Sequence, residues 1–458
     1  MKIRRLFSLF FCLVLALSLA APARAAADDV GDWEVEAKAA LLIDPDTEEI
    51  LYARNIHERL YPASLTKIMT CLLVLEAIDS KVIAMDTVLT ASEPAVTSIP
   101  PDGSTAGIQV GEELTVEELL YCIMLSSANE GCNILAEAVS GSIEAFVEKM
   151  NDKAAALKCE DTRFANTNGL PDPNHYTTAW DLYVITKEAR THPEFMPLVG
   201  TIYHEVPATN LSEARKLYTT NYLISSYRTS YYLYQGADGI KTGSTSAAGH
   251  CLVASASRSG RSLLSVVLGT ERVTLEDGTI LTKSFVETGK LFDWGFDGFT
   301  RQILLGGDEL VGEVPVTLSQ EQNTVKVHPS EEVERLLPKE MNPKTDVDRT
   351  ITLTEESVEA PVTKGQVLGQ MTLSSGDTVY AVVDLLADED VSASRLLVFR
   401  RDLVEFLQRP AVWIAAGGAV GVVVLLLVLR AVLKSRRRRY SRRSARSGRN
   451  TGYRGRRR

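Results

Sequence analysis

The chain has 458 residues, of which 45% are hydrophobic and 24% are charged. This length exceeds that of one ordinary domain, and the composition excludes both a disordered chain and one embedded throughout in a membrane. The formal net charge of −10 conceals an asymmetry, because residues 26–429 carry 31 basic and 59 acidic residues, a net charge of −28. So acidic a body argues against nucleic acid as its partner.

The first 25 residues have the pattern of a secretory signal. Three basic residues precede an apolar run from Leu6 to Ala21, and Ala23-Arg24-Ala25 supplies the small residues of a cleavage site. The apolar run is too short for an uncleaved span, so we predict a signal peptide over residues 1–25 and export of the chain. Five cysteines remain after it, an odd number at spacings that match no metal site. We therefore expect buried thiols rather than a disulfide framework, and no bound metal.

The elements that follow begin with a strand pair. Apolar runs at residues 39–44 and 50–54 flank a polar turn and predict a β-hairpin. Residues 62–76 open with a proline and a hydroxyl residue and continue as an apolar run, which predicts a buried helix. A loop rich in Pro, Gly and Ser covers residues 92–111. Three further helical patterns follow, at residues 116–125, 129–139 and 143–157.

Strand signals return after Gly239. Residues 249–257 and 261–269 predict two strands joined by a tight turn, and a helix predicted at residues 280–292 would pack back on their sheet. Strands, then helices, then strands again predict a mixed α/β domain over residues 31–295.

Helix signals fade over residues 298–390, which we predict to be a small all-β domain. Its strand patterns lie at residues 350–354, 367–373 and 378–386. Residues 395–409 place Phe399, Leu403, Phe406 and Leu407 on one helical face, so this juxtamembrane helix either lies at a membrane surface or forms a short stalk.

Residues 411–429 contain no charged side chain, a length of 19 residues that can cross a bilayer as a helix. Arg430, Lys434 and four consecutive arginines follow directly, and positive charge marks the cytoplasmic side. We predict a single span at residues 411–433, a basic cytoplasmic tail at residues 434–458, and a body on the outer face of the cell membrane. The tail can hold anionic lipid head groups, although a plain stop-transfer signal explains it as well.

One Ser-x-x-Lys pair, Ser64 and Lys67, occurs in the chain. On a helix, positions i and i+3 share a face, so the lysine amine can act as base for the serine if burial or a neighbouring cation lowers its pKa. The helix N-terminus also favours negative charge developing at Ser64. Taken alone, the pair is better explained as a helix start with Ser64 as N-cap and Lys67 in solvent.

Ser127-Ala-Asn129 lies at a turn between two predicted helices. A serine and an asparagine two residues apart at a turn can point into one cleft, where they relay protons and hold a substrate amide. The alternative is structural, because Ser127 and Glu130 have the spacing of a helix capping box.

Lys241-Thr242-Gly243 opens the second strand region. A strand edge here would offer backbone groups to an extended peptide. Lys241 would lower the pKa of Lys67 and attract a carboxylate, and Gly243 would let the substrate approach closely. Alone, this motif is better explained as an exposed turn. The three motifs together, in this order, are far more specific, since they form the signature of penicillin-binding proteins and class A β-lactamases.

The sequence resembles the low-molecular-mass penicillin-binding proteins of the D-alanyl-D-alanine carboxypeptidase type. The resemblance is carried by residues 62–70, 97–101, 126–129, 164–170, 238–243 and 252–256, and by residues 360–369 for the second domain. It implies an α/β (α+β) penicillin-binding/β-lactamase-like transpeptidase domain, followed by a small all-β sandwich domain. The one C-terminal transmembrane helix predicted above, with its basic tail, replaces the purely amphipathic anchor of some family members. The resemblance also implies a role in peptidoglycan biosynthesis and cell shape, with no cofactor.

The resemblance further implies that Ser64 attacks the carbonyl between the two terminal D-alanines of a stem pentapeptide, with Lys67 and Ser127 as the other catalytic residues. D-Alanine leaves, water hydrolyses the acyl-enzyme, and β-lactams acylate Ser64 as substrate mimics. The oxyanion would lie between the backbone N–H groups of Ser64 and Ser244. The residues implied in substrate binding are Asn129, Lys241, Thr242, Gly243 and Ser244.

The sequence departs from the family pattern at three positions. Ala128 fills a variable position, and Asn168 replaces a frequent histidine that we expect to lie outside the core chemistry. Arg272 is a further candidate for carboxylate binding, although its local spacing differs from the family's. Three other functions stay open: a β-lactamase, for which residues 160–164 match the deacylating glutamate loop poorly, an endopeptidase or transpeptidase, and a non-catalytic wall sensor.

Overall fold

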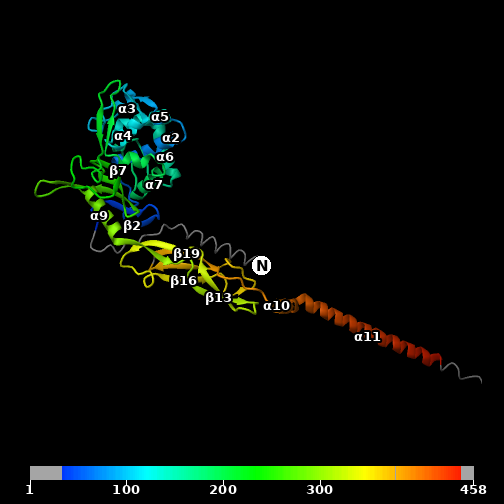
Figure 1. The fold of residues 1–458 in the computed structure, drawn as a ribbon. Helices are drawn as coiled ribbons and strands as arrows, with labels where there is room; N and C mark the ends of the chain where they lie inside the picture. The colour runs from blue at the N-terminus through cyan, green and yellow to red at the C-terminus, as the bar shows by residue number, and fades with distance from the viewer. Residues whose placement is uncertain (1–33, 377, 445–458) are drawn as a thin grey trace, which may run out of the picture. The chain divides into compact units, whose positions relative to one another are not determined.

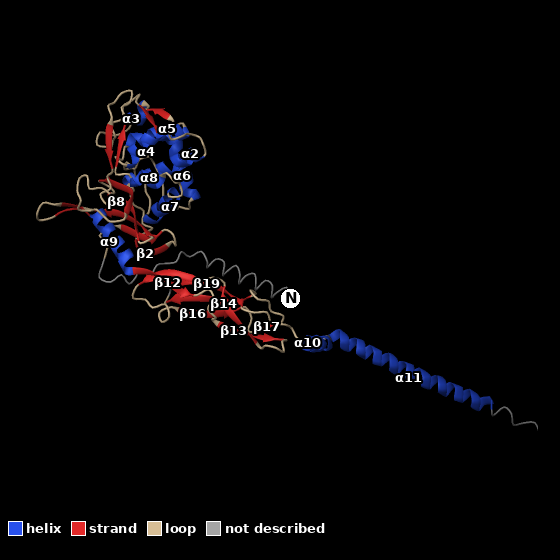
Figure 2. Cartoon of the chain, in the orientation of Figure 1, coloured by secondary structure: helices blue, strands red, loops and turns tan. Residues whose placement is uncertain are grey.

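The computed structural model describes residues 34–376 and 378–444, so the predicted signal peptide and the end of the basic tail lie outside the described residues. The described chain divides into two compact units. The first contains the residues up to Leu304, together with Val333–Arg349 and Thr372–Ala381, and the second contains the remainder. Figure 1 and Figure 2 show the elements of each unit.

A five-stranded antiparallel sheet forms the centre of the first unit. Its order is β2-β1-β9-β8-β7, which joins the N-terminal hairpin to strands almost 200 residues further along the chain. The strands are β1 (Ala39–Asp44), β2 (Glu49–Arg54), β7 (Ala237–Thr245), β8 (Gly249–Arg258) and β9 (Arg261–Thr270). Because β7 is an edge strand, its outer backbone groups are free to pair with an extended chain.

Helices cover both faces of this sheet. On one face lies a cluster around α2 (Lys67–Asp79), a helix buried on nearly every side. The other elements of this unit's helical part are η1 (Ala63–Thr66), α3 (Glu93–Thr97), α4 (Val116–Met124), α5 (Asn129–Ser140), α6 (Ile143–Ala156), α7 (Ala179–Ala189) and α8 (Phe195–Gly200). On the other face, α9 (Lys283–Gly298) packs against β8 and β9 through Phe285, Leu291 and Phe292. The five described cysteines are buried and unpaired.

Three short strand pairs accompany the central sheet. They are β3 (Val88–Thr90) with β4 (Glu113–Thr115), β5 (Tyr203–Val206) with β6 (Arg215–Tyr218), and β10 (Arg272–Thr274) with β11 (Ile280–Thr282). The last of these corrects one prediction. The helix expected at residues 280–292 begins at Lys283, because Ile280–Thr282 pair with Arg272–Thr274 as a strand.

Two other predictions about local structure were incomplete. The loop expected at residues 92–111 contains α3, whose first turn is capped when Ser92 accepts a hydrogen bond from the Ala95 N–H. The helix expected at residues 62–76 starts as the tight turn η1, and the α-helix begins only at Lys67. The hairpin at the N-terminus and the helices at α4, α5 and α6 lie where the sequence predicts them, within a residue or two.

The second part of the chain is all-β. A six-stranded sheet has the order β16-β18-β19-β14-β13-β17, and β12 pairs with β15. The strands are β12 (Phe299–Leu305), β13 (Gly312–Thr317), β14 (Thr324–Pro329), β15 (Val333–Pro338), β16 (Asp348–Leu353), β17 (Val358–Glu359), β18 (Val367–Ser375) and β19 (Thr378–Ala387). Three of these match predicted strands, and the other five were not predicted.

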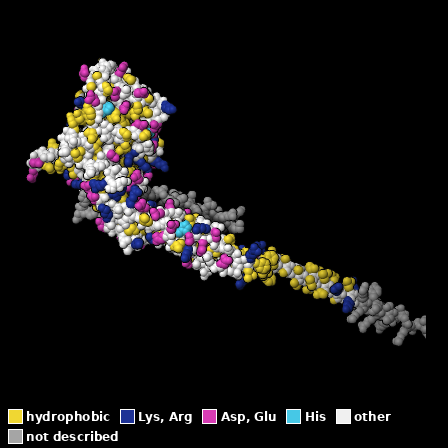
Figure 3. Space-filling model, in the orientation of Figure 1, with side chains coloured by type: hydrophobic (Ala, Val, Ile, Leu, Met, Phe, Trp, Pro, Cys, Tyr) yellow, Lys and Arg dark blue, Asp and Glu magenta, His cyan; other side chains and the backbone are white. Residues whose placement is uncertain are grey.

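Two helices end the described chain, α10 (Arg395–Gln408) and α11 (Pro410–Ser444). Within α11, the segment Pro410–Arg436 contains an 18-residue window with a mean hydropathy of 2.7, and none of that window is buried in the protein. Figure 3 shows the hydrophobic side chains along this helix. By length and composition this is one candidate membrane span among the described residues.

Candidate active site

The junction of η1 and α2 places Ser64 beside Lys67. Ser64 is partly exposed, whereas Lys67 is fully buried. The Lys67 Nζ lies 2.9 Å from the Ser64 Oγ, 2.7 Å from the Asn129 Oδ1 and 2.8 Å from the backbone oxygen of Asn168. Ser64 does not cap the helix, because Pro62 and Thr66 occupy the two N-cap positions. The alternative explanation, with Ser64 as N-cap and Lys67 in solvent, is therefore wrong for both residues.

The three contacts of Lys67 are chemically different. The Asn129 Oδ1 and the Asn168 carbonyl oxygen can only accept hydrogen bonds, so each requires an N–H of Lys67. The Ser64 hydroxyl can donate or accept. When Lys67 loses a proton, its two remaining N–H groups stay on the two acceptors, and the free electron pair faces the Ser64 hydroxyl.

Burial favours that neutral form, because it lowers the pKa of Lys67 to about 8. Burial and then the charge of Lys67 lower the pKa of Lys241 to about 7. The sequence predicted the reverse assignment, with Lys241 lowering the pKa of Lys67. Since the two charges repel each other, loss of the Lys67 proton removes the effect on Lys241, which then holds its own proton more tightly.

If Lys67 is the base that accepts the Ser64 proton, its pKa makes the rate of Ser64 acylation depend on pH. Below pH 8 Lys67 is mostly protonated, so we expect kcat/KM for acylation of Ser64 by a penicillin to rise about tenfold per pH unit up to pH 8 and then level off. Stopped-flow acylation between pH 5.5 and 9.5 measures this. A rate that stays constant between pH 6 and 8 would contradict Lys67 as the base.

The turn before α5 carries Ser127 and the start of the helix carries Asn129, whose Oδ1 accepts from Lys67. Ser127 has a φ of +62°, a conformation that serines rarely adopt outside constrained sites. It does not form the capping box that its spacing with Glu130 suggested, because Ala128 is the N-cap and has no side-chain cap. Glu130 instead accepts hydrogen bonds from the Thr105 hydroxyl and the Ala106 N–H.

Lys241 joins this turn to the sheet edge. It lies on β7, is buried, and donates to the Ser127 Oγ at 3.2 Å and to the carbonyl oxygen of Thr242 at 3.1 Å. Its position excludes the exposed turn that the motif alone suggested. The Thr242 hydroxyl shares a 2.6 Å hydrogen bond with the Thr220 hydroxyl.

Gly243 lies where β7 contacts η1. A Cβ at this position would lie 2.9 Å from the carbonyl oxygen of Pro62 and 3.2 Å from the amide nitrogen of Ser64. The absence of a side chain therefore lets β7 pack directly against η1, a role that the sequence did not predict. This packing brings the backbone that follows Gly243 next to the backbone of Ser64.

Residues 166–175 contact the turn that carries Ser64 and the side chain of Lys67, and the sequence did not predict these contacts. A Cβ on Gly169 would lie 1.8 Å from the carbonyl oxygen of Ala63. The Thr66 hydroxyl donates to that same oxygen and lies 2.8 Å from the Nε2 of His175. Asn168, expected to lie outside the core chemistry, contacts Lys67 through its backbone oxygen.

The tautomer of His175 follows from its contacts. Its Nδ1 accepts from the Ala165 N–H, so its Nε2 carries the proton and donates to Thr66. Burial lowers the pKa of His175 to about 4, so the ring stays neutral at pH 7. Because the Thr66 hydroxyl then donates onward to Ala63, these contacts fix the turn that carries Ser64.

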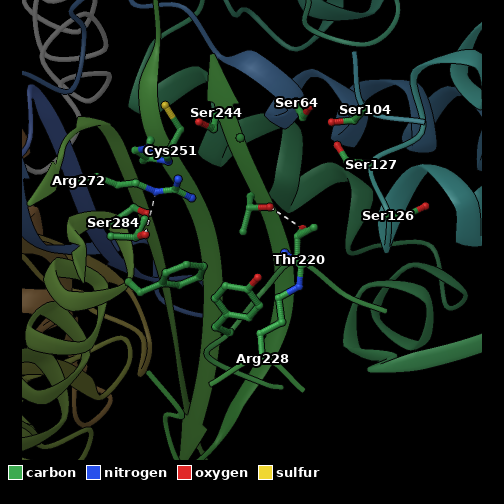
Figure 4. A pocket seen from close by; sticks show the side chains of 16 residues that line it. Ser64, Ser104, Ser126, Ser127, Thr220, Arg228, Ser244, Cys251, Arg272 and Ser284 are labelled. Atoms are coloured by element: carbon green, nitrogen blue, oxygen red, sulfur yellow. Dashed lines mark hydrogen bonds between the residues drawn. The ribbon is translucent and has the colours of Figure 1, made fainter. Parts of the chain in front are cut away.

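Ser64, Ser127, Thr242 and Gly243 line one cleft of about 250 Å³, shown in Figure 4. Its walls contain hydroxyl groups, aromatic rings and cations but no carboxylate. The lining residues are Ser64, Ser104, Ser126, Ser127, Thr220, Tyr222, Arg228, Thr242, Gly243, Ser244, His250, Cys251, Arg272, Thr282, Ser284 and Phe285. In the described part of the chain, no group of three or more His, Cys, Asp or Glu side chains could hold a metal ion.

The fold and this cleft define a serine peptidase of the penicillin-binding type. A family model described as D-alanyl-D-alanine carboxypeptidase matches residues 23–272, and one described as the penicillin-binding protein 5 C-terminal domain matches residues 299–393. The chain therefore belongs to the D-alanyl-D-alanine carboxypeptidase family, and its activity is that of a serine-type carboxypeptidase.

Relatives of known function extend over both domains. The chain is 33% identical to the D-alanyl-D-alanine carboxypeptidase DacF of Bacillus subtilis, over 86% of this chain and 97% of that protein. It is 30% identical to DacD of Escherichia coli, over 78% of this chain and 87% of that protein. The crystal structure of penicillin binding protein 5 from Haemophilus influenzae matches with a TM-score of 0.59 and 30% identity, over 79% and 99% of the two chains.

Proposed function

We propose that Ser64 is the nucleophile of this carboxypeptidase and Lys67 its general base. Ser64 attacks the carbonyl between the two terminal D-alanines of a peptidoglycan stem pentapeptide, D-alanine leaves, and water hydrolyses the acyl-enzyme. The observation that carries the proposal is the arrangement around Lys67, whose two other contacts are acceptors that leave its electron pair facing the Ser64 hydroxyl.

The developing oxyanion would be bound by the backbone N–H groups of Ser64 and Ser244. Close packing of β7 on η1 at Gly243 supports this, since it brings these two segments of backbone together. Each preorganised donor of this kind contributes roughly 3 kcal/mol to stabilising the transition state.

The remaining residues have separate roles in this proposal. Ser127, held by the Lys241 ammonium, passes a proton to the leaving nitrogen. Because the Asn129 Oδ1 is occupied by Lys67, its Nδ2 is the group left to hold a substrate carbonyl. The Thr242 hydroxyl, with Arg272 on the neighbouring hairpin, binds the terminal carboxylate.

β-Lactams would acylate Ser64 in the same way as the peptide. A β-lactamase would need a carboxylate to activate the deacylating water, and no carboxylate lines the cleft. Glu160, the residue weighed for that role, lines a separate pocket between α6 and Tyr176. This favours slow deacylation of a bound penicillin.

We also propose the placement of the chain in the cell. Residues 1–25 are a signal peptide, residues 31–295 are the catalytic domain, and residues 298–390 are the β-domain on the outer face of the membrane. An apolar span at residues 411–433 follows the juxtamembrane helix of residues 395–409, and the basic run after it supports a cytoplasmic tail at residues 434–458.

Mass spectrometry of muropeptides tests the proposed function. We expect the wild-type chain to convert pentapeptides to tetrapeptides with release of D-alanine, and Ser64→Ala to release it at least about 10³-fold more slowly. Ser126→Ala, which removes a hydroxyl from the same cleft, should retain most of the activity. D-Alanine release by Ser64→Ala at the wild-type rate would rule out Ser64 as the nucleophile.

A further inference from the structure

The cleft continues past the place proposed for the terminal carboxylate. Thr242 shares its hydroxyl hydrogen bond with Thr220, and the same cleft is also lined by Tyr222, Arg228 and Phe285. Figure 4 shows Arg228 below Thr220, and it shows Arg272 across β7 beside Ser284. In the part of the cleft proposed for the leaving group, Arg228 and Arg272 therefore lie on opposite sides of Thr242.

Neither arginine is neutralised by a carboxylate. Arg272 contacts the Thr282 hydroxyl through its Nε, and the exposed Arg228 has no recorded ion pair or hydrogen bond within residues 34–376 and 378–444. This is unusual for the body of the chain, which has a net charge of −28. His250, which also lines the cleft, has a lowered pKa because of burial and the charge of Arg272.

The buried Lys241 is not a third cation that is free to bind a carboxylate of the ligand. The Lys241 ammonium is 1% exposed and already donates to Ser127 and Thr242. The exposed cations of the cleft are thus Arg228 and Arg272, and one terminal carboxylate at Thr242 accounts for only one of them. An arginine fork that faces a cleft without an acidic neighbour is suited to a carboxylate of the ligand.

We propose that Arg228 is a specificity-determining residue that binds a second carboxylate on the leaving group. The cleft then accepts a C-terminal D-amino acid with an acidic side chain, as well as D-alanine. The aromatic rings of Tyr222 and Phe285 would contact the aliphatic part of such a side chain. A stem-peptide cross-link presents the same chemistry where the acceptor stem ends at a cross-linking diamino diacid, because that leaving residue then has two free carboxylates.

The chemical step is unchanged in this proposal. The Ser64 Oγ forms an ester with the penultimate D-alanine carbonyl carbon, the C–N bond breaks, and the leaving nitrogen takes up the proton that Ser64 lost. Water then hydrolyses the ester and restores the serine. Only the side chain of the leaving amino acid differs, and it lies on the Arg228 side of Thr242.

This inference rests on the proposed function, so the experiment compares two substrates of the full-length chain in detergent micelles. They are synthetic peptides that end in D-Ala-D-Ala and in D-Ala-D-Glu. We expect kcat/KM for the D-Glu peptide to be at least one-tenth of that for the D-Ala peptide. A ratio below one-hundredth overturns the inference, whereas failure to cleave the D-Ala peptide would instead overturn the proposed function.

Variants then assign the preference to the positive charge at position 228. Arg228→Gln should lower the ratio of the two kcat/KM values, D-Glu over D-Ala, about tenfold, and Arg228→Lys should lower it less than threefold. Arg59→Gln, an arginine outside the cleft that pairs with Asp161, should leave both values unchanged. A ratio that is unaffected by Arg228→Gln overturns the inference even if both rates fall together.

A cross-linked muropeptide dimer forms a second arm that separates the two sources of this chemistry. If Arg228→Gln slows cleavage of both the dimer and the D-Glu peptide, relative to the D-Ala peptide, the cross-link is the source in the wall. If it slows only the D-Glu peptide, the source is a free acidic D-amino acid at the stem terminus. Both outcomes support Arg228 as the determinant, and an effect on neither overturns it.

Discussion

Replacing Lys67 with glutamine should slow acylation of Ser64 by about 10²- to 10⁴-fold, the range expected when a general base is removed. Glutamine can still donate N–H groups toward the Asn129 Oδ1 and the Asn168 oxygen, so the cleft keeps its hydrogen bonds. Its amide nitrogen has no basic electron pair for the Ser64 proton. Time courses of labelling with a fluorescent penicillin measure the acylation rate directly.

The matched control for this prediction is Lys149→Gln. Lys149 is an exposed lysine on α6 and does not line the cleft, so its replacement should leave the acylation rate unchanged. An acylation rate for Lys67→Gln within tenfold of wild type would show that another group takes the proton from Ser64.

Replacing Gly169 with alanine should destabilise the catalytic domain by at least about 4 kcal/mol, among the most severe effects of a single substitution. Gly169 has a φ of +91°, and a Cβ would lie 1.8 Å from the Ala63 carbonyl oxygen. That oxygen belongs to the turn that carries Ser64 and also accepts from Thr66. Thermal unfolding should show a melting temperature about 10 °C lower than wild type.

Gly260→Ala is the control that separates the steric clash of a Cβ with Ala63 from the cost of a positive φ at a non-glycine residue. Gly260 has a φ of +78°, but a Cβ there would meet no heavy atom within 4 Å. Its replacement should therefore cost only about 1–2 kcal/mol, the cost of a left-handed conformation for an L-residue. Equal losses of stability in the two variants would show that the contact with Ala63 is not what requires Gly169.

The sequence predicted the chemical groups of the cleft better than it predicted their contacts. Ser64 and Lys67 share a face because they are three residues apart, which local geometry alone requires. The structure places the other motif residues around them, and the resemblance anticipated that grouping. The local pattern could not show which lysine lowers the pKa of the other. Burial lowers the pKa of both Lys67 and Lys241, and the charge of Lys67 lowers that of Lys241 further.

The supporting contacts were not predicted, because they come from loops whose conformations depend on tertiary packing. His175 lies 109 residues from Thr66 in the chain, and no periodic pattern connects the two. Gly169 and Gly243 each allow a close approach of two backbones, which a single glycine in a sequence does not reveal. Arg228 lies in an irregular segment rich in tyrosine, where the sequence offered no motif.

Secondary structure was predicted best where the pattern was long. The helices α4, α5 and α6 carry clear apolar faces, whereas β17 has only two residues and β13 contains Pro315, so both give weak strand signals. The start of α9 was misplaced, because Ile280–Thr282 have an apolar pattern that suits a helix as well as the strand they form.

The most direct test of the central claim, that Ser64 is a nucleophile activated by Lys67, is the mass of the acylated protein. Incubation of the full-length chain with a penicillin should add the mass of one penicillin, and peptide mapping should place it on the peptide that contains Ser64. Ser64→Ala should gain no mass under the same conditions. An adduct of the same mass on Ser64→Ala, or one mapped to Ser127 in the wild type, would contradict the account.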